Sequence, residues 1–231
     1  FTLASHLRGS DLFMDMFDRE EYVHSLLDYC TQVACKMAEY YVDAGMDVIA
    51  VVDPLISQIS TSAFETFMAD PFSRLFARIR ELGVYSSFFV CGDATRNIEA
   101  MCKTGCHAIS VDENVDLKAA KAICDRYGVS IGGNIPLTTT MLHGTQQDNM
   151  KWVVDLLDSL EDHTGLVVAP GCDMPFETPF ENTIGCSQAV LQTDQVREMV
   201  RDYTATEDTL DVELPDYEHL NKPLVEAFTL D

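Results

Sequence analysis

Basic residues are scarce in this chain of 231 residues. Lysine and arginine number 15, against 38 aspartates and glutamates, and the formal net charge is −23. A charge of this size and sign opposes sequence-independent attraction to the phosphates of nucleic acid and to anionic lipid. We therefore expect no nucleic-acid partner.

The sequence also lacks long hydrophobic runs and low-complexity segments. No apolar run approaches the ~20 residues that a membrane-spanning helix needs, so a membrane protein is not expected. Hydrophobic residues make up 47% of the chain, with 12 glycines and 8 prolines, as is typical of a globular protein. A chain of 231 residues is long enough for one large core.

Cysteines and catalytic motifs are sparse as well. The 8 cysteines are too dilute in a chain of this length for a small secreted disulfide scaffold, so we expect reduced thiols. No basic segment followed by an apolar one opens the chain, and we therefore expect a cytoplasmic location. The H-E-x-x-H, G-x-S-x-G, Walker and G-x-G-x-x-G patterns are all missing.

Helical and strand patterns alternate along the chain. Apolar residues recur every three or four positions over residues 18–44, which predicts a long amphipathic helix that ends at Gly45. The following apolar, mostly β-branched residues 48–52 predict a buried strand. Further helices are predicted over residues 62–82, 95–103, 117–126, 146–160 and 180–203, and further strands over residues 86–91, 108–111, 129–132 and 166–169.

Helix–glycine–strand repetition with short connections predicts a parallel sheet. Residues 1–4 read like the end of a strand, which makes six strands, and the chain does not begin with Met, so we expect preceding residues in the native protein. A doubly wound sheet and a (β/α)8 barrel lacking its first strands both fit this pattern, and the barrel is preferred. We expect a partial barrel over residues 1–203, an acidic linker over 204–222 and the start of a further domain at 223–231.

Chemically active residues follow most of the predicted strands. In parallel α/β folds, functional residues collect where strands end, and in a barrel these ends converge on one mouth. The segments at these positions are Asp53-Pro54, Cys91-Gly92-Asp93, Asp112-Glu113, Gly133-Asn134 and Pro170-Gly171-Cys172-Asp173. They make this mouth the candidate site.

Cys91 and Cys172 each stand beside a glycine at a strand end. Thiolates favour zinc, so the pair is a candidate metal site, although buried free cysteines also occur as small hydrophobic residues. Asp53 could cap the following segment, and Asp112-Glu113 could begin a solvated helix. The other six cysteines are interpreted as packing residues, and none of the histidines stands at a clear strand end.

These strand-end segments, in this order, resemble the uroporphyrinogen decarboxylase superfamily, and more closely its corrinoid-dependent methyltransferase branch. The resemblance covers almost the whole chain. The stretches that carry it are Phe1-Thr2-Leu3-Ala4, Asp53-Pro54 to Ile59-Ser60 with Phe64, Val90-Cys91-Gly92-Asp93-Ala94-Thr95, Ile109-Ser110-Val111-Asp112-Glu113, Gly133-Asn134 with Leu142 and Gly144-Thr145, and Ala169-Pro170-Gly171-Cys172-Asp173-Met174-Pro175 with Thr178-Pro179 and Glu181-Asn182. The resemblance implies a (β/α)8 barrel whose front portion precedes Phe1.

The resemblance also implies a zinc-assisted methyltransferase. In that branch a His-x-Cys and a later cysteine hold zinc, which activates a small thiol, and the methyl group moves between that thiol or a methylated substrate and methylcobalamin, or a related corrinoid, carried by a partner protein. Cys91 and Cys172 match the two thiolate ligands, but Phe89 stands at the histidine position. A zinc ion with three protein ligands would therefore need a replacement ligand such as Asp53, Asp112 or Glu113. The resemblance leaves Asp53 and Glu113 as candidate catalytic residues.

Asp112 and Asn134 are the candidate substrate-binding residues. Porphyrinogen decarboxylation is an alternative activity, although the acidic chain is an awkward host for a polyanionic porphyrin. Phe89 favours another alternative, a non-catalytic barrel that binds a corrinoid or its carrier protein.

Overall fold

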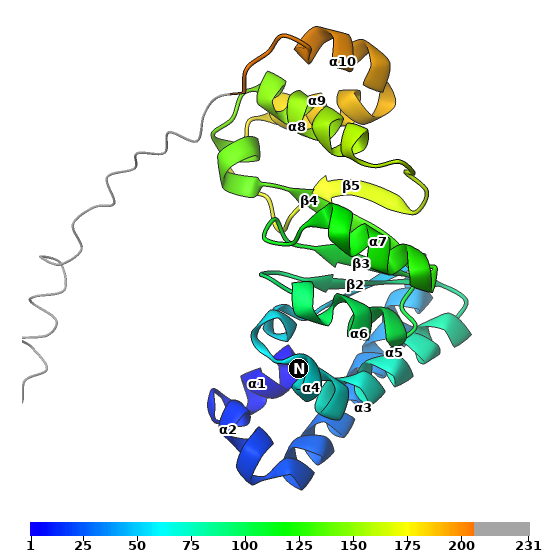
Figure 1. The fold of residues 1–231 in the computed structure, drawn as a ribbon. Helices are drawn as coiled ribbons and strands as arrows, with labels where there is room; N and C mark the ends of the chain where they lie inside the picture. Colours follow the sequence, from blue (N-terminus) through cyan, green and yellow to red (C-terminus); the bar gives the residue numbers. More distant parts are fainter. Residues whose placement is uncertain (206–231) are drawn as a thin grey trace, which may run out of the picture.

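Five parallel strands form one sheet in the order β1-β2-β3-β4-β5 (Figure 1). The computed structural model describes residues 1–205. Its strands are β1 (Val48–Val52), β2 (Tyr85–Val90), β3 (Ala108–Val111), β4 (Ser130–Ile135) and β5 (Leu166–Pro170). Each strand pairs with its neighbour in sequence, whereas a doubly wound sheet reverses its strand order partway. The winding is therefore that of a barrel, and the doubly wound alternative is excluded.

Helices precede the sheet and connect its strands. They are α1 (Thr2–Arg8), α2 (Asp11–Asp18), α3 (Glu20–Asp43), η1 (Pro54–Gln58), α4 (Thr61–Ala63), η2 (Phe64–Met68), α5 (Ala69–Glu81), η3 (Thr95–Asn97), α6 (Ile98–Lys103), α7 (Leu117–Tyr127), η4 (Leu137–Leu142), α8 (Gln146–Ser159), α9 (Phe180–Leu191) and α10 (Thr193–Val200). Local sequence sets several ends: Asp116 caps α7, Gly128 closes it with φ 65°, and Thr145 and Asp148 form a capping box on α8. No helix within residues 1–205 is long and apolar enough to cross a membrane.

The structure differs from the sequence predictions at the start of the chain and at several element boundaries. Residues 1–4 are not a strand end: Phe1 caps α1, and Thr2 to Ala4 lie in it, so the described part has five strands and not six. The carboxylate of Asp53, distant in sequence, accepts hydrogen bonds at the start of α1, a tertiary contact that local composition does not reveal. The helix predicted over 180–203 breaks at Gln192 into α9 and α10, and β4 continues to Ile135.

The predicted acidic linker and the predicted further domain fall almost entirely outside the described residues. Only positions 204 and 205 of the linker are described, and they have no regular secondary structure. Both remain predictions.

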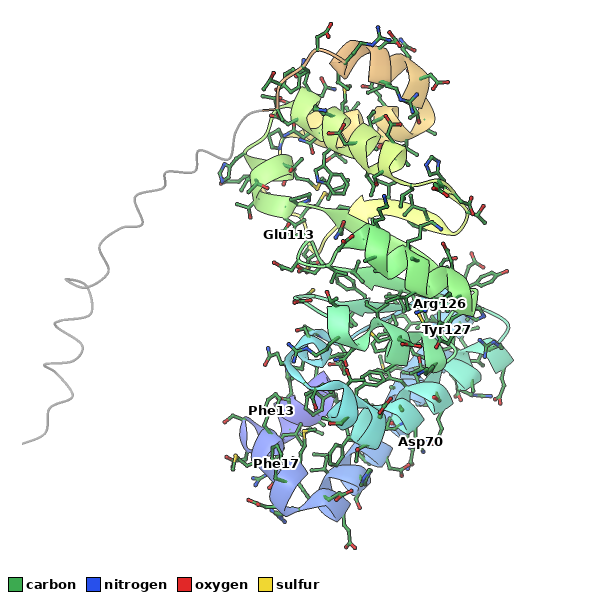
Figure 2. All side chains as sticks on the ribbon, in the orientation of Figure 1. Phe13, Phe17, Asp70, Glu113, Arg126 and Tyr127 are labelled. Carbon is green, nitrogen blue, oxygen red and sulfur yellow. The ribbon has the colours of Figure 1, made fainter. Side chains whose placement is uncertain are left out.

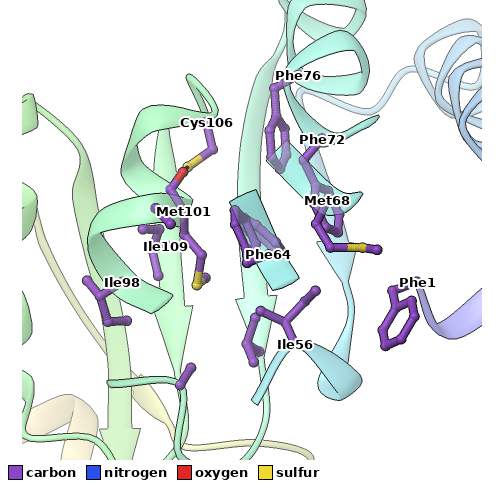
Figure 3. Packing of buried hydrophobic residues seen from close by; sticks show 14 of the residues in the cluster. Phe1, Ile56, Phe64, Met68, Phe72, Phe76, Ile98, Met101, Cys106 and Ile109 are labelled. Atoms are coloured by element: carbon purple, nitrogen blue, oxygen red, sulfur yellow. Dashed lines mark hydrogen bonds between the residues drawn. The ribbon is translucent and has the colours of Figure 1, made fainter. Parts of the chain in front are cut away.

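Aromatic side chains fix the connection between β1 and β2 onto the sheet (Figure 3). Phe72 and Phe76 of α5 lie with ring centroids 4.4 and 5.3 Å from that of Phe88 in β2, and Phe64 stacks on Phe72. Phe64, Phe76 and Phe88 are fully buried. Buried aromatic rings contribute strongly to core stability, so this cluster orients β2, which leads into Cys91.

All five strands end at the same edge of the sheet, because every pairing is parallel. Glu113, which follows β3, lies at this edge, whereas Arg126 and Tyr127 at the end of α7 lie at the opposite one (Figure 2). The loops after the strands therefore meet at one side of the molecule, which we call the carboxyl edge.

Candidate functional site

The sulfur atoms of Cys91 and Cys172 meet at the carboxyl edge, 2.7 Å apart. Cys91 follows directly on β2, and Cys172 follows β5 by two residues. Two strands separate β2 from β5 in the sheet, so a flat sheet would hold their ends about 14 Å apart, three steps of ~4.8 Å. Curvature of the sheet and the two loops close this gap and bring together residues that are 81 positions apart in sequence.

Glycines beside the cysteines let the loops approach one another closely. A Cβ atom on Gly92 would lie 2.9 Å from the Ser57 hydroxyl, and Gly92 has φ +79°, which favours glycine. A Cβ atom on Gly171 would lie 2.9 Å from the Glu113 backbone nitrogen and 3.4 Å from the Ile135 carbonyl oxygen. Any larger residue at these positions would displace the loops that carry the sulfurs.

The surroundings of Cys91 disfavour its thiolate. Burial is the largest cause, followed by the hydrogen bond with Cys172, and the charges of Asp112 and Asp173 add to it; together they raise the pKa of Cys91 to about 12. The Cys91 thiol is therefore protonated at neutral pH unless a bound group offsets this environment.

The two predicted catalytic carboxylates, Asp53 and Glu113, accept hydrogen bonds from backbone N–H groups. Asp53 is buried and accepts hydrogen bonds from the backbone nitrogens of Phe1 and Thr2, and from the Thr2 hydroxyl at 2.6 Å. Glu113 accepts the Leu137 N–H at 2.5 Å, at the first residue of η4. These contacts give both side chains a positioning role, and their catalytic role stays a prediction.

The two predicted substrate-binding residues are in contact, because the Asn134 side chain binds the Asp112 backbone. The Asn134 side-chain amide donates to the carbonyl oxygens of Asp112 at 3.0 Å and Val115 at 2.7 Å, and Asn134 is buried in β4 rather than placed after it. The Asp112 carboxylate accepts from the backbone N–H and the side chain of Asn114. Asp112 is also close enough to Cys91 to raise the pKa of that thiol.

Sequence reasoning gave no role to three further asparagines that bind backbone in the same way. Each of the four donates from Nδ2 to two backbone carbonyl oxygens: Asn97 to Ile56 and Ile59, Asn134 to Asp112 and Val115, Asn149 to Thr140 and Thr145, and Asn182 to Met141 and Gly144. All four are buried. Only the fold identifies the carbonyl oxygens that accept these hydrogen bonds.

The remaining cysteines fit their predicted packing role. Cys30, Cys102, Cys106, Cys124 and Cys186 are buried, and Cys35 on α3 is half-buried. Among the remaining cysteines, Cys102 and Cys124 form a close pair, with sulfurs 3.8 Å apart in the interior.

The residues present do not fit a complete zinc site. Among residues 1–205, no group of three or more His, Cys, Asp or Glu side chains is arranged to hold a metal ion. Phe89 shares a face of β2 with the residue two positions on, Cys91, and has no donor atom. Tetrahedral zinc with bonds of ~2.3 Å holds two sulfurs about 3.8 Å apart, farther than the 2.7 Å observed here.

Comparisons with known proteins agree with this topology. A methyltransferase from Methanosarcina mazei superposes with a TM-score of 0.76 at 24% sequence identity, over 84% of this chain and 56% of the other. The fold is therefore an α/β fold of the (β/α)8 barrel type, of which residues 1–205 supply five strands.

Two curated relatives differ in activity. The methylcobamide:CoM methyltransferase MtbA of Methanosarcina acetivorans is 32% identical over 184 residues, which are 79% of this chain and 52% of the relative. The uroporphyrinogen decarboxylase of Anaeromyxobacter dehalogenans is 27% identical over 196 residues, or 82% of this chain and 55% of that enzyme.

The chain thus spans about half the length of the curated relatives it matches. The family model described as "Uroporphyrinogen decarboxylase (URO-D)" matches residues 1–191, most of the chain. Together with the single winding of the sheet and the strand-end segments, this match shows that the chain belongs to the uroporphyrinogen decarboxylase family.

Proposed function

We propose that this chain works in methyl transfer between a corrinoid protein and a small thiol or methylated substrate. The observation that carries the proposal is the meeting of Cys91 and Cys172 at the carboxyl edge, with sulfurs 2.7 Å apart. Sulfur is the soft donor that this chemistry uses, and the pair joins the loops that follow β2 and β5. The similarity to MtbA, over 79% of this chain, supports the same branch.

The residues of the chain would build and hold the reaction site. Glu113, Asn134 and Asn97 fix the loops around the sulfurs through their backbone hydrogen bonds. Asp112 and Asp173 supply negative charge beside Cys91. A positively charged group bound there would offset this charge and lower the pKa of Cys91, making its thiolate more accessible.

A zinc ion, if bound, would stabilise a thiolate and so activate a small thiol as a methyl acceptor. Within residues 1–205, no third His, Cys, Asp or Glu side chain joins the two sulfurs in a group that could hold the ion. The corrinoid would arrive on its carrier protein, at the edge where the strand-end loops gather.

Porphyrinogen decarboxylation is the second candidate, because uroporphyrinogen decarboxylases are among the relatives. Its substrate is a polycarboxylate, and Asp112, Glu113 and Asp173 make the loops around the sulfurs acidic. Charge repulsion therefore favours methyl transfer over decarboxylation. A barrel that binds the corrinoid protein without transfer is the third candidate, favoured by Phe89 in place of a ligand.

The test is transfer of the methyl group from methylcobalamin to a small thiol, followed by the change in corrinoid absorbance. We expect turnover by the reduced full chain, and a loss of at least ~10-fold in Cys91→Ser and in Cys172→Ser. Cys35→Ser is the matched control, since Cys35 is half-buried but lies on α3. Binding of a corrinoid protein without turnover would favour the assembly role, and porphyrinogen turnover that does not need the cysteines would favour decarboxylation.

A further inference from the structure

We propose that Cys91 and Cys172 form a reversible dithiol–disulfide couple that responds to small-molecule disulfides. The proposal goes beyond methyl transfer, because it needs only the two sulfurs and an oxidant. If the proposed function holds, closing the disulfide would also switch that function off, since both sulfurs would be consumed.

The spacing of the two sulfurs favours a covalent bond between them. The two sulfurs lie 2.7 Å apart, which is closer to the ~2.05 Å of a disulfide bond than to the ~3.8 Å spacing of two zinc-bound thiolates. The pair Cys102 and Cys124 provides an internal comparison: the Cys102 thiol donates a hydrogen bond to the Cys124 sulfur across 3.8 Å. The Cys91–Cys172 arrangement is therefore poised for a covalent bond between the sulfurs.

The two sulfurs are also more accessible to a small reagent than those of the core pair. Cys91 and Cys172 are both half-buried in loops at the carboxyl edge, whereas Cys102 and Cys124 are buried in the core. Thiol–disulfide exchange requires an attacking reagent to reach a sulfur atom, so the same oxidant reaches the first pair and not the second.

Within the described residues, no third metal ligand accompanies the two cysteines. A third metal ligand near the pair would hold both thiolates on an ion and protect them from oxidation. Phe89 occupies the nearest same-face position on β2, and no group of three donors exists within residues 1–205. The two sulfurs are thus left to react with each other.

The reaction balances with a disulfide R–S–S–R as oxidant. One cysteine thiol loses its proton, and its thiolate attacks a sulfur of R–S–S–R and breaks the S–S bond. A mixed disulfide forms, and the departing RS⁻ takes up a proton and leaves as RSH. The second cysteine then attacks the mixed disulfide at the protein sulfur and releases the second RSH. The two cysteines lose two electrons and two protons in total, and the reagent gains both. A small thiol reverses both steps.

The experiment maps thiols in the folded full chain. The reduced protein is incubated anaerobically with oxidised glutathione, then quenched with N-ethylmaleimide and digested without reductant. Trypsin leaves Cys91 in the peptide 81–96 but places Cys172 and Cys186 together in 152–197, so a glutamate-specific protease that cleaves at Glu181 must separate these two. The linked peptide is then read by mass spectrometry.

We expect a Cys91–Cys172 link, with two of the eight cysteines lost to alkylation and recovered by reduced glutathione. Cys172→Ser should instead carry glutathione on Cys91, and Cys91→Ser should carry it on Cys172. Cys35→Ser should behave like the natural chain.

Three results would overturn the proposal. One is stable glutathione adducts on both Cys91 and Cys172 without a link between them. Another is a link that forms only after unfolding in urea, and the last is preferential oxidation of Cys102 with Cys124. Because the readout is thiol chemistry, a failure of methyl transfer leaves this test intact, and a failed link leaves methyl transfer to be judged by its own assay.

Discussion

Gly171 and Glu113 lie so close that a Cβ atom on Gly171 would come within 2.9 Å of the Glu113 backbone nitrogen. Real Cβ atoms do not approach backbone this closely, so the loop after β5 can follow its path only with glycine at this position. The Glu113 side chain continues the contact by accepting the Leu137 N–H. Three strand-end loops are thereby locked together beside Cys172.

Gly171→Ala should move the Cys172 loop away from Cys91. We expect a stability loss of about 1–3 kcal/mol, as for other overpacking substitutions, together with a lower yield of the Cys91–Cys172 disulfide. Urea unfolding and peptide mapping measure the two effects. Gly128→Ala is the control: Gly128 has φ +65° and no neighbour within 4 Å of a Cβ, so this variant should lose some stability and keep the disulfide yield. An unchanged yield in Gly171→Ala would contradict the positioning role.

Asn97→Ala should destabilise the loop after β1. The Asn97 side-chain amide is fully buried and donates to the carbonyl oxygens of Ile56 at 2.9 Å and Ile59 at 3.1 Å. Leaving two buried carbonyls without donors costs roughly 2–4 kcal/mol, which urea unfolding can measure. The exposed Asn114→Ala serves as control and should change stability far less. Equal effects would show that the Asn97 bonds are not important.

Stability should fall as the pH drops below about 6.5, and His107 should account for part of the fall. Burial, with a smaller effect of Arg80, lowers the pKa of His107 in the folded chain, and the Ser86 N–H donates to its Nδ1 at 3.1 Å. The folded state therefore favours neutral His107, so its contribution is present above the unfolded pKa and is lost as protons bind.

His107→Asn should flatten the pH dependence of the urea midpoint between pH 5 and 7, and His143→Asn, at an exposed position, should not. The groups facing His107 are Arg80, Ser86 and the Tyr85 ring. A profile that is the same in His107→Asn and the natural chain would rule out this histidine as a source.

Oxidation of the Cys91–Cys172 pair should stabilise the fold. The bond would link residues 81 positions apart, and the chain-entropy relation gives about 4–5 kcal/mol for a loop of this length. The urea midpoint of the oxidised chain should therefore exceed that of the reduced chain, whereas Cys172→Ser should respond little to oxidant. An oxidised chain of equal or lower stability would mean that the bond strains the fold.

The sequence predicts most of the architecture because its signals are local. The helix–glycine–strand alternation gives five strands within a few residues of their observed ends, and parallel winding brings the strand-end segments to one edge. The barrel-type fold and the family are confirmed. The same reasoning places Cys91 and Cys172 at that edge, where their sulfurs meet.

The features that the sequence does not predict depend on contacts between residues that are distant in the chain. The carboxylate of Asp53 reaches Thr2, so that residues 1–4 begin a helix rather than end a strand. Glu113 and Asn134 look like free polar groups at strand ends, but in the fold they bind backbone groups of Leu137, Asp112 and Val115. These backbone hydrogen-bond partners can be identified only from the folded structure.

Zinc binding by the reduced chain tests most directly whether Cys91 and Cys172 form one site with two donors. Zinc per chain and its affinity would be measured by mass spectrometry and competition with a chelator, for the natural chain, Phe89→His, and Phe89→His combined with Cys172→Ser. We expect weak binding by the natural chain, about one tightly held zinc in Phe89→His, and loss of that zinc in the double variant. Equally tight zinc in the natural chain and in Phe89→His, or tight zinc that survives Cys172→Ser, would contradict the account.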